Sequence, residues 1–225
     1  MLHRLRHHLR PLLPARHRHR ATLLLLRVTA IALRGNRVQC PCCGRGFRRF
    51  LRYPTSFCPG CGSYERQRLL CLYLDRHPEL LEPAVRILHV APEDCIRDRV
   101  LRIKPRAYLS IDREYPEAMR QMDVTRLELP EAGYDLVLIS HVLDVVADEA
   151  AALRELYRVL AAGGVAIVQA PPHLTADEPR LVSALTAAGF AVETGTVPEQ
   201  ADAEAAARLG LLPGERLLTC RKPPA

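Results

Sequence analysis

The sequence has no tryptophan and only two lysines, so thirty of its thirty-two basic residues are arginines. It also has no acidic residue before Glu65, although residues 1–64 contain thirteen arginines. The formal net charge of +7 is therefore a difference between +13 in that segment and −6 in residues 65–225. This asymmetry predicts an anionic partner for the first segment, with nucleic acid the obvious class. A general bias toward arginine is the alternative explanation, because charge bears on association and not on fold.

The chain also lacks an apolar run of membrane-spanning length. Residues 21–33 come nearest, but Arg27 interrupts them and Arg34 follows, whereas a spanning helix needs about 20 apolar residues. No small-residue cleavage site follows the run, so it does not read as an export signal. We therefore expect no membrane insertion and a cytoplasmic protein. Residues 1–36 are predicted to form a basic arm and a short amphipathic helix over 21–34.

Four of the eight cysteines form two C-x-x-C units, Cys40 with Cys43 and Cys58 with Cys61. Fourteen residues separate the units, and a glycine follows each second cysteine. Two such turns can supply the four sulfur ligands of a closed, structural Zn²⁺ site, whose metal folds a segment too small to fold alone. We predict a zinc-ribbon-like module over residues 37–64. A pair of disulfides, redox catalysis, and Cys42 in place of Cys43 are the alternatives.

The segment between the two cysteine units interleaves Phe47, Phe50 and Tyr53 with arginines. Nucleic-acid-binding zinc modules use aromatic rings for stacking and guanidinium groups for phosphate. The aromatics of an ordinary zinc ribbon form its only core, and this second explanation is the one we favour.

Strands and helices alternate in the rest of the chain. The apolar spacing predicts a linker helix within residues 65–82. Short β-rich runs follow at 85–91, 107–112, 134–140, 165–170, 190–197 and 216–221. Helical patterns lie at 94–103, 148–161, 178–188 and 202–209, with Gly163 and Gly164 expected to end the second of them. The alternation predicts an α/β fold, a Rossmann-like, doubly wound, mostly parallel sheet.

Ligands of such a sheet bind beyond the carboxyl ends of the strands, where the strand order reverses. The loop 89–94 after the first strand is therefore the predicted cofactor site. Asp112 ends the next strand nineteen residues after Glu93, where a carboxylate can accept hydrogen bonds from ribose hydroxyls.

Six stretches carry a family resemblance. They are the two cysteine units with residues 58–70, Leu-His-Val-Ala-Pro-Glu at 88–93, Tyr-Leu-Ser-Ile-Asp at 108–112, Met-Asp-Val-Thr at 122–125, Tyr-Asp-Leu-Val-Leu-Ile-Ser-His-Val-Leu at 134–143, and Leu-Arg-Glu-Leu-Tyr-Arg-Val-Leu-Ala-Ala-Gly-Gly at 153–164. From about residue 33 to residue 222 the chain resembles class I S-adenosylmethionine-dependent methyltransferases, of the type 11 kind, with an N-terminal cysteine-rich zinc module. The resemblance implies a methyltransferase domain over 83–225 whose last strands form an antiparallel hairpin.

The resemblance also implies S-adenosylmethionine as cofactor beside a structural Zn²⁺. The residues implied for the cofactor are His89, Ala91, Glu93, Asp112, Arg113, Asp123, Val124 and Ser140. Asp112 would bind the ribose, Asp123 the adenine amino group, and Val124 would lie against the ring. The loop from Ala91 to Glu93, with Ser140, would surround the methionine portion. His141 is a candidate general base, with a hydrogen-bonded structural histidine as the alternative.

Two departures from the family pattern bear on function. The loop after the first strand has no glycine, so we expect no backbone with positive φ there. Only ten residues separate Asp112 from Asp123, so the crossover is expected to be a single helical turn over 116–120. The leading prediction is a methyltransferase acting on a small molecule or RNA. The alternative is a non-catalytic RNA- or protein-binding module built on a degenerate methyltransferase domain.

Overall fold

The computed structural model describes residues 28–52, 55–103, 105–169, 178–196, 201–212 and 214–224. The expected basic arm, the first half of the helix expected at 21–34, and Tyr53 lie outside the described residues. Residues 28–32 are helical.

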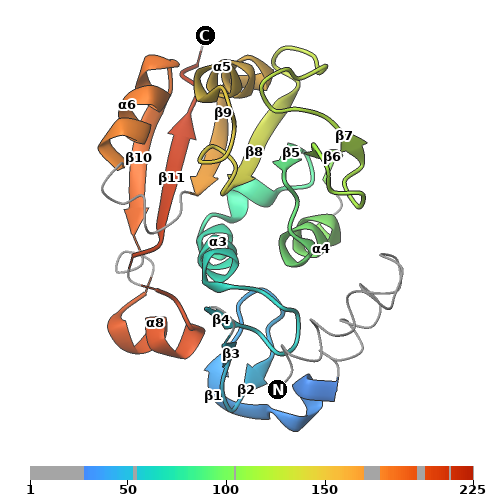
Figure 1. The fold of residues 1–225 in the computed structure, drawn as a ribbon, viewed down its shortest axis with the longest axis vertical. Coiled ribbons are helices and arrows are strands. Elements are labelled where there is room, and N and C mark those ends of the chain that lie inside the picture. The colour runs from blue at the N-terminus through green and yellow to red at the C-terminus, as the bar shows by residue number, and fades with distance from the viewer. Residues whose placement is uncertain are drawn as a thin grey trace.

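The elements follow one another along the chain as shown in Figure 1. The N-terminal strands are β1 (Arg34–Gln39), β2 (Gly46–Phe47), β3 (Leu51–Arg52) and β4 (Ser56–Phe57). The strands of the large sheet are β5 (Arg86–Val90), β6 (Ala107–Asp112), β7 (Arg120–Gln121), β8 (Tyr134–Ser140), β9 (Leu160–Gln169), β10 (Ala191–Thr196) and β11 (Arg216–Arg221). The helices are α3 (Glu65–Arg76), the 3-10 helix η1 (Pro78–Leu81), α4 (Asp94–Arg102), α5 (Glu149–Val159), α6 (Glu178–Ala187) and α8 (Ala203–Leu209).

The large sheet has the strand order β10-β11-β9-β8-β5-β6-β7. Strands β7, β6, β5, β8 and β9 are parallel, whereas β11 runs antiparallel to both β9 and β10. The mostly parallel α/β sheet with an antiparallel C-terminal hairpin is therefore confirmed. Because β5 lies between β6 and β8, the strand order reverses at β5, and its carboxyl end is the point where such sheets bind ligands.

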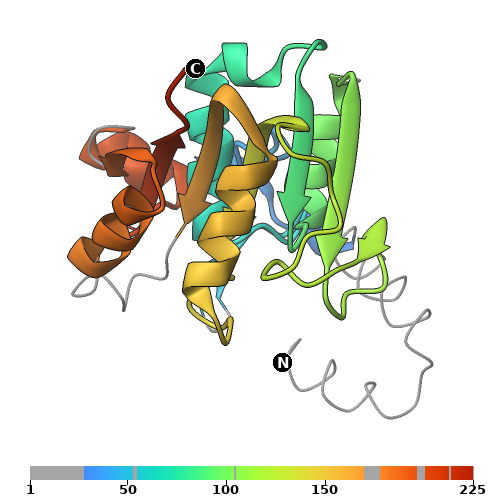
Figure 2. The same ribbon diagram turned by 90° about the horizontal axis from the view of Figure 1, so that it is seen from above.

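Helices cover both faces of the sheet. Figure 2 shows α5 and α6 on one side, and α3 with the N-terminal strands on the other. The buried cluster under α3 and α4 includes Leu69, Leu74, Ile87, Ile96 and Leu138. The cluster under α5 and α6 includes Leu88, Val137, Leu153, Leu156 and Leu185. Alternate residues of β5 thus enter opposite clusters, as the period-2 geometry of a strand that is buried on both faces requires.

The crossover from β6 to β7 differs from the expected helical turn. Residues 113–119 form bends and turns, and β7 then pairs in parallel with β6, Ile111 opposite Arg120. Asp112 accounts for this, because its Oδ1 accepts hydrogen bonds from the backbone N–H groups of Glu114 and Tyr115, both at 2.7 Å. A side chain that caps the turn in this way offers the backbone an alternative to helical bonds.

Gly163 and Gly164 were expected to end the helix at 148–161, but they do not. Helix α5 ends at Val159, and β9 starts at the next residue and runs through both glycines. Gly163 donates its N–H to Lys222 O, and Gly164 O accepts from Lys222 N. These bonds to the C-terminal segment satisfy the backbone locally, so strand pairing prevails over the glycine signal.

The N-terminal strands share one buried cluster with α3 and the sheet. Arg68 of α3 is fully buried and joins three segments, donating at 2.6 Å each to Ser63 O, Ser56 Oγ and Gly210 O. Its guanidinium also lies 4.3 Å from the ring centroid of Phe50. The segment 65–82, expected as a linker, is therefore a core element. No described helix has the length and apolar character needed to cross a membrane.

Candidate active site and metal-binding cluster

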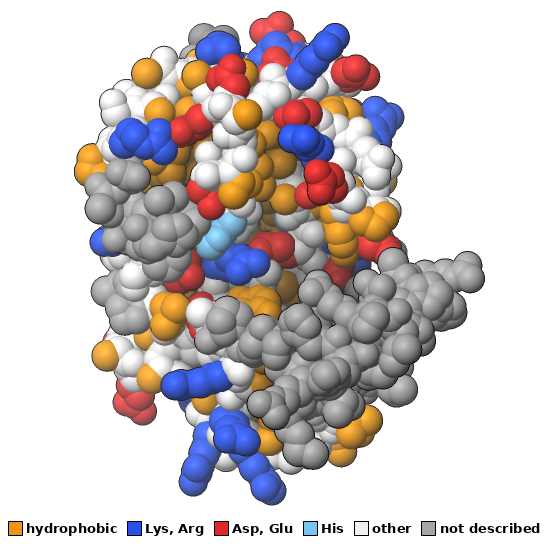
Figure 3. Space-filling model, in the orientation of Figure 1, with side chains coloured by type: hydrophobic (Ala, Val, Ile, Leu, Met, Phe, Trp, Pro, Cys, Tyr) orange, Lys and Arg blue, Asp and Glu red, His pale blue; other side chains and the backbone are white. Residues whose placement is uncertain are grey.

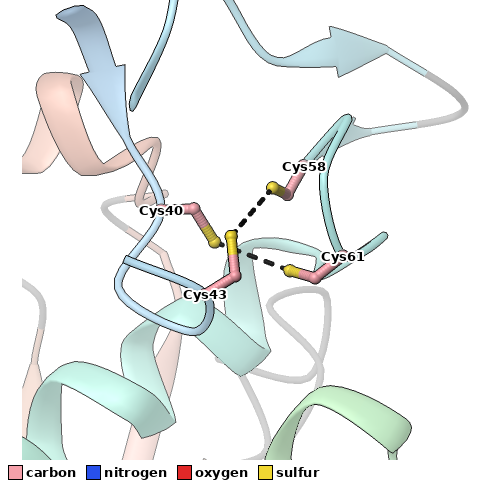
Figure 4. A group of neighbouring side chains, drawn as sticks. All are labelled: Cys40, Cys43, Cys58 and Cys61. Atoms are coloured by element: carbon pink, nitrogen blue, oxygen red, sulfur yellow. Dashed lines mark hydrogen bonds between the residues drawn. The ribbon is translucent and has the colours of Figure 1, made fainter. Parts of the chain in front are cut away.

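The two cysteine units face each other and bring four sulfur atoms together (Figure 4). Each Sγ lies within 4.8 Å of the other three. The Cys40 and Cys61 sulfurs are 3.7 Å apart, and the Cys43 and Cys58 sulfurs 3.8 Å. A tetrahedral ion with Zn–S bonds of about 2.3 Å requires sulfurs separated by roughly 3.8 Å. The four predicted ligands thus fit Zn²⁺.

Both units have the same backbone geometry, which explains the glycine after each. Gly44 and Gly62 adopt φ values of 71° and 76°, and each donates its N–H to the carbonyl of the first cysteine of its unit, at 2.8 and 2.9 Å. Positive φ is readily adopted by glycine alone. The Ser63 hydroxyl lies 3.2 Å from the sulfurs of both Cys40 and Cys61 and supports the cluster from one side.

Cys42 lies outside this group of four, although it stands beside Cys43 in the sequence. Its side chain is buried and interacts with Cys71 of α3 and Cys95 of α4. Cys42 therefore contributes to the contact between the N-terminal strands and the helices. None of the eight cysteines forms a disulfide in the structure.

Two strand ends at the reversal point carry left-handed residues. Ala91 follows β5 with φ 51°, and its N–H donates to Ile111 O at 2.8 Å. His141 follows the neighbouring β8 with φ 55°, and its N–H donates to Gln169 O at 3.0 Å. The expectation that a glycine-free loop lacks positive φ is therefore wrong. L residues in this conformation are strained and cluster at functional sites, which favours a binding role for this edge.

Glu93 binds side chains of α3. Its Oε1 accepts hydrogen bonds from Arg66 Nε at 3.1 Å and Gln67 Nε2 at 2.8 Å. Burial raises the pKa of Glu93, while the Arg66 guanidinium beside it opposes that increase. Its Oε2 is buried and has no hydrogen-bond partner among the described residues. One carboxylate oxygen thus anchors the loop to α3, and the other is unsatisfied among the described residues.

Asp112 stands at the end of β6, next to the loop after β5. Only its Oδ1 takes the two backbone bonds described above. Arg113 is exposed, with Nε 3.9 Å from an Oε1 of Glu114. The structure thus gives Asp112 a position at the predicted edge and leaves Arg113 on the surface.

Asp123 and Val124 follow β7. The Oδ1 of Asp123 accepts from the Thr125 N–H at 2.9 Å and from its hydroxyl at 2.8 Å, and the backbone bond lowers the pKa of Asp123. Val124 is buried in the cluster under α5 and α6. An exposed acid beside a buried aliphatic residue thus borders the outer end of the site.

His89 lies inside the sheet, one residue before the end of β5. Its Nδ1 is 3.0 Å from the Tyr108 hydroxyl, and burial lowers the pKa of His89 to about 3. The imidazole is therefore neutral and packs beneath the loop that begins at Ala91.

Ser140 ends β8 at the centre of the edge, opposite Gln169 of β9. Ser140 is 8% exposed, and its Oγ has no hydrogen-bond partner among the described residues. The half-buried His141 follows it. These residues lie on one edge of the sheet, together with those after β5 and β6. Two residues of the predicted set lie elsewhere: His89 beneath the edge and Arg113 on the surface.

Three residues that the sequence analysis did not single out also lie at this edge. Gln169 ends β9, Glu215 precedes β11, and Arg66 lies in the first turn of α3. A polar residue that ends an apolar run, as Gln169 does, is a signal that could have been used. Nothing local marks Glu215, because the charged groups that act on it come from α3 and from the loop after β5.

Figure 3 shows a hollow on this face, between the upper sheet and the lower N-terminal strands, where acidic, basic and histidine side chains meet. Residues 97–168 match the model of the methyltransferase domain family. The matched segment runs from α4 through β9 and includes Asp112, Ser140 and His141.

One curated relative is the ubiquinone/menaquinone biosynthesis C-methyltransferase of Xanthomonas campestris, 47% identical over 57 residues. That match covers 25% of this chain and 22% of the relative, so the chain spans about a fifth of the length of the relative it matches.

Solved structures share the fold. An S-adenosylmethionine-dependent methyltransferase from Mesorhizobium loti superposes with a TM-score of 0.53 at 18% identity, covering 68% of this chain and 97% of that one. The [4+2]-cyclase SpnF gives a TM-score of 0.50 at 18% identity, covering 79% and 87%. The match to the methyltransferase domain family thus covers about a third of the chain, and the solved structures share its fold.

Proposed function

We propose that the protein transfers a methyl group from S-adenosylmethionine to an acceptor held at the carboxyl edge of β8 and β9. The observation that carries the proposal is the pair of left-handed turns at Ala91 and His141, on adjacent strands at the point where the strand order reverses. Conformations this costly persist where the surrounding structure enforces them, typically at a binding site.

The cofactor residues fit the group by their hydrogen-bonding capacity. Glu93 Oε2 and Ser140 Oγ are buried and have no hydrogen-bond partner among the described residues. The amino and carboxylate groups of a methionine moiety can supply these partners. Asp112 uses one oxygen for its own turn and can accept ribose hydroxyls with the other. Asp123 and Val124 are proposed to lie against the adenine. The backbone of Ala91 is proposed to contact the cofactor. His89 supports this loop from below, and Arg113 borders the ribose.

The bound cofactor supplies an electrophilic methyl group on a positively charged sulfur. The protein's contribution is to hold the acceptor atom in line with it, which is where the rate advantage of positioning arises. Acidic groups at Glu93 and Asp112 favour a cationic ligand in this crevice. We retain His141 as the candidate general base, since it is half-buried next to Ser140.

Zn²⁺ bound by Cys40, Cys43, Cys58 and Cys61 is proposed to be structural. Four sulfur ligands fill the coordination of the ion and leave no position for water. Its role is to hold the N-terminal strands against α3, from which Arg66 and Gln67 reach the loop after β5.

A nucleic-acid contact is proposed for the N-terminal strands, and RNA is one acceptor class beside small molecules. All six described arginines of this part are exposed, and no acid lies among residues 28–64: Arg34, Arg37, Arg45, Arg48, Arg49 and Arg52. Figure 3 shows basic side chains at the lower end of this face. RNA affinity should then fall steeply with salt, as counterion release requires. An affinity for a 20-nucleotide RNA that is equal in low and high salt would exclude this contact.

Titration calorimetry with S-adenosylhomocysteine tests the cofactor site. We expect binding by the wild type and an affinity roughly tenfold lower for Asp112→Asn, since a hydrogen bond to a charged group is lost. Asp98→Asn, on the exposed side of α4, is the matched control. Absence of binding by the folded, zinc-loaded protein would favour the alternative function, a non-catalytic binding module.

Transfer of radiolabelled methyl from the cofactor into fractionated cell extract identifies the acceptor class. Label is expected in the small-molecule or the RNA fraction. Label in neither fraction, from a protein that binds the cofactor, would contradict methyl transfer to these acceptors.

A further inference from the structure

Glu215 stands at the same edge of the sheet as the proposed cofactor site, but at its opposite end. It directly precedes β11, which runs antiparallel to β9, with Leu218 opposite Val168. The start of β11 therefore lies beside the end of β9, where Gln169 stands. Glu215 and Gln169 thus border the edge on the far side of Ser140 from the loop after β5.

The side chains of Glu215 and Gln169 are buried, and each has an oxygen without a hydrogen-bond partner among the described residues. Glu215 is 5% exposed and Gln169 is 3% exposed. Glu215 Oε2 and Gln169 Oε1 have no hydrogen-bond partner among the described residues. The amide orientation of Gln169 is set by its Nε2, which donates to Arg66 O at 2.9 Å, so the amide oxygen is the atom that remains. A buried acceptor without a donor costs free energy unless a ligand satisfies it.

The two arginines near Glu215 donate hydrogen bonds to other groups. The charged groups that act on it are Glu65, Arg66, Arg68 and Glu93. Arg66 binds Glu93, whereas Arg68 donates to Ser63, Ser56 and Gly210.

Glu65, the first residue of α3, has partners of its own, Thr55 and the backbone N–H of Ser56. Glu65, Arg66 and Arg68 thus all have hydrogen-bond partners other than Glu215. Burial raises the pKa of Glu215 to about 7, so this carboxyl is partly ionised at neutral pH.

A ligand that satisfies these two oxygens must donate hydrogen bonds. An ammonium group offers three donors and a positive charge, and so complements a carboxylate beside an amide oxygen. A carboxylate or phosphate would instead place acceptor against acceptor. We propose that Glu215 and Gln169 form a subsite for an amino group of the methyl acceptor, which makes the acceptor an amine-bearing small molecule. The inference rests on the proposed function, since it assigns the half of the edge that the cofactor leaves open.

Fragments of one shape but different charge test the subsite. Benzylamine, benzyl alcohol and benzoate are titrated into isotope-labelled protein saturated with S-adenosylhomocysteine, and binding is followed by NMR. Benzylamine is expected to bind most tightly and benzoate not at all. Its affinity should rise from pH 6 to pH 8, as Glu215 ionises.

Glu215→Gln should weaken benzylamine binding roughly tenfold and abolish its dependence on pH, because one charge-assisted bond is lost. Glu193→Gln, on an exposed position of the adjacent strand β10, should change neither. If Glu215→Gln does not fold, Gln169→Met serves as the second variant and should also weaken benzylamine binding.

Benzoate binding equal to that of benzylamine, or benzylamine binding unchanged in Glu215→Gln, would overturn the proposal. If Glu215→Gln also lost S-adenosylhomocysteine binding, Glu215 would belong to the cofactor site, and the proposal would again be overturned. Benzylamine binding that depends on Glu215, in a protein that does not bind S-adenosylhomocysteine, would support the subsite while contradicting the methyltransferase proposal. The two can therefore fail separately.

Discussion

Arg66 and Glu93 form an ion pair, with Arg66 Nε 3.1 Å from an Oε1 of Glu93 and the two side chains 30% and 14% exposed. Arg66 belongs to the first turn of α3, immediately after the cysteine units, and Glu93 belongs to the loop after β5. The pair therefore joins the helix that follows the cysteine units to the proposed cofactor site.

Replacement of Arg66 by Met should weaken S-adenosylhomocysteine binding roughly tenfold, because it leaves the buried Glu93 carboxyl without its cation. Calorimetry on the purified variant measures this. Arg97→Met is the control, since Arg97 pairs with Asp94 on α4 at 2.9 Å and should leave the affinity unchanged. Equal affinities for the two variants would mean that the ion pair between Arg66 and Glu93 does not contribute to cofactor binding.

Cys43→Ser should lose zinc, whereas Cys42→Ser should retain one ion per chain. The adjacent thiols differ in position, since only Cys43 belongs to the group of four sulfurs. Metal content by mass spectrometry measures the result, and thermal unfolding reports folding. Retention of zinc by Cys43→Ser together with its loss by Cys42→Ser would reverse the ligand assignment.

Loss of zinc is also expected to unfold more than residues 37–64. Cys40, Phe47 and Cys58 share one buried cluster with Leu70 and Ile87, so the module and the sheet should unfold together. A single unfolding transition in Cys58→Ser, with cofactor binding lost, is the expected result. This differs from the behaviour of a separable module, for which cofactor binding would survive.

Arg68→Met should lower the free energy of unfolding by about 3 kcal/mol, because three carbonyl or hydroxyl partners lose a buried donor. Urea unfolding gives the value. Arg76→Met, exposed at the last turn of the same helix, should change stability by less than about 0.5 kcal/mol. A similar loss in both variants would mean that the buried hydrogen bonds of Arg68 are not the cause.

Stability should decrease as the pH falls below about 6.5, through His89. Its pKa is about 3 in the folded protein against an ordinary 6.5, so only the unfolded chain takes up the proton between these values. The predicted cost is about 2 kcal/mol at pH 5, from roughly 1.4 kcal/mol per pH unit. His89→Asn should flatten this part of the profile, and His77→Asn should not. Chemical denaturation at several pH values measures it, and a slope retained in His89→Asn would contradict the assignment.

The sequence predicted much of the fold because its strands are short, apolar and bounded by turn residues. The bounds expected for 107–112, 134–140 and 216–221 are those of β6, β8 and β11. Failures arose where tertiary contacts prevail over local signals. Gly164 pairs with Lys222 inside β9, and Ala91 takes a positive φ that the bond to Ile111 O stabilises. Buried polar groups such as Glu215 are set by elements distant in sequence, which periodicity does not reveal.

The bond from Arg68 to the carbonyl of Gly210 spans 142 positions of the chain. Gly210 itself has φ 66° and approaches Phe50 so closely that a Cβ there would lie 2.4 Å from the ring. During synthesis, the arginine and its surroundings are made long before their last partner emerges from the ribosome. Arg68 can bind Ser56 and Ser63 early, but its contact with Gly210 must wait for nearly the whole chain. A nascent or truncated protein that ends before residue 210 would thus expose a buried cation to water and to chaperones.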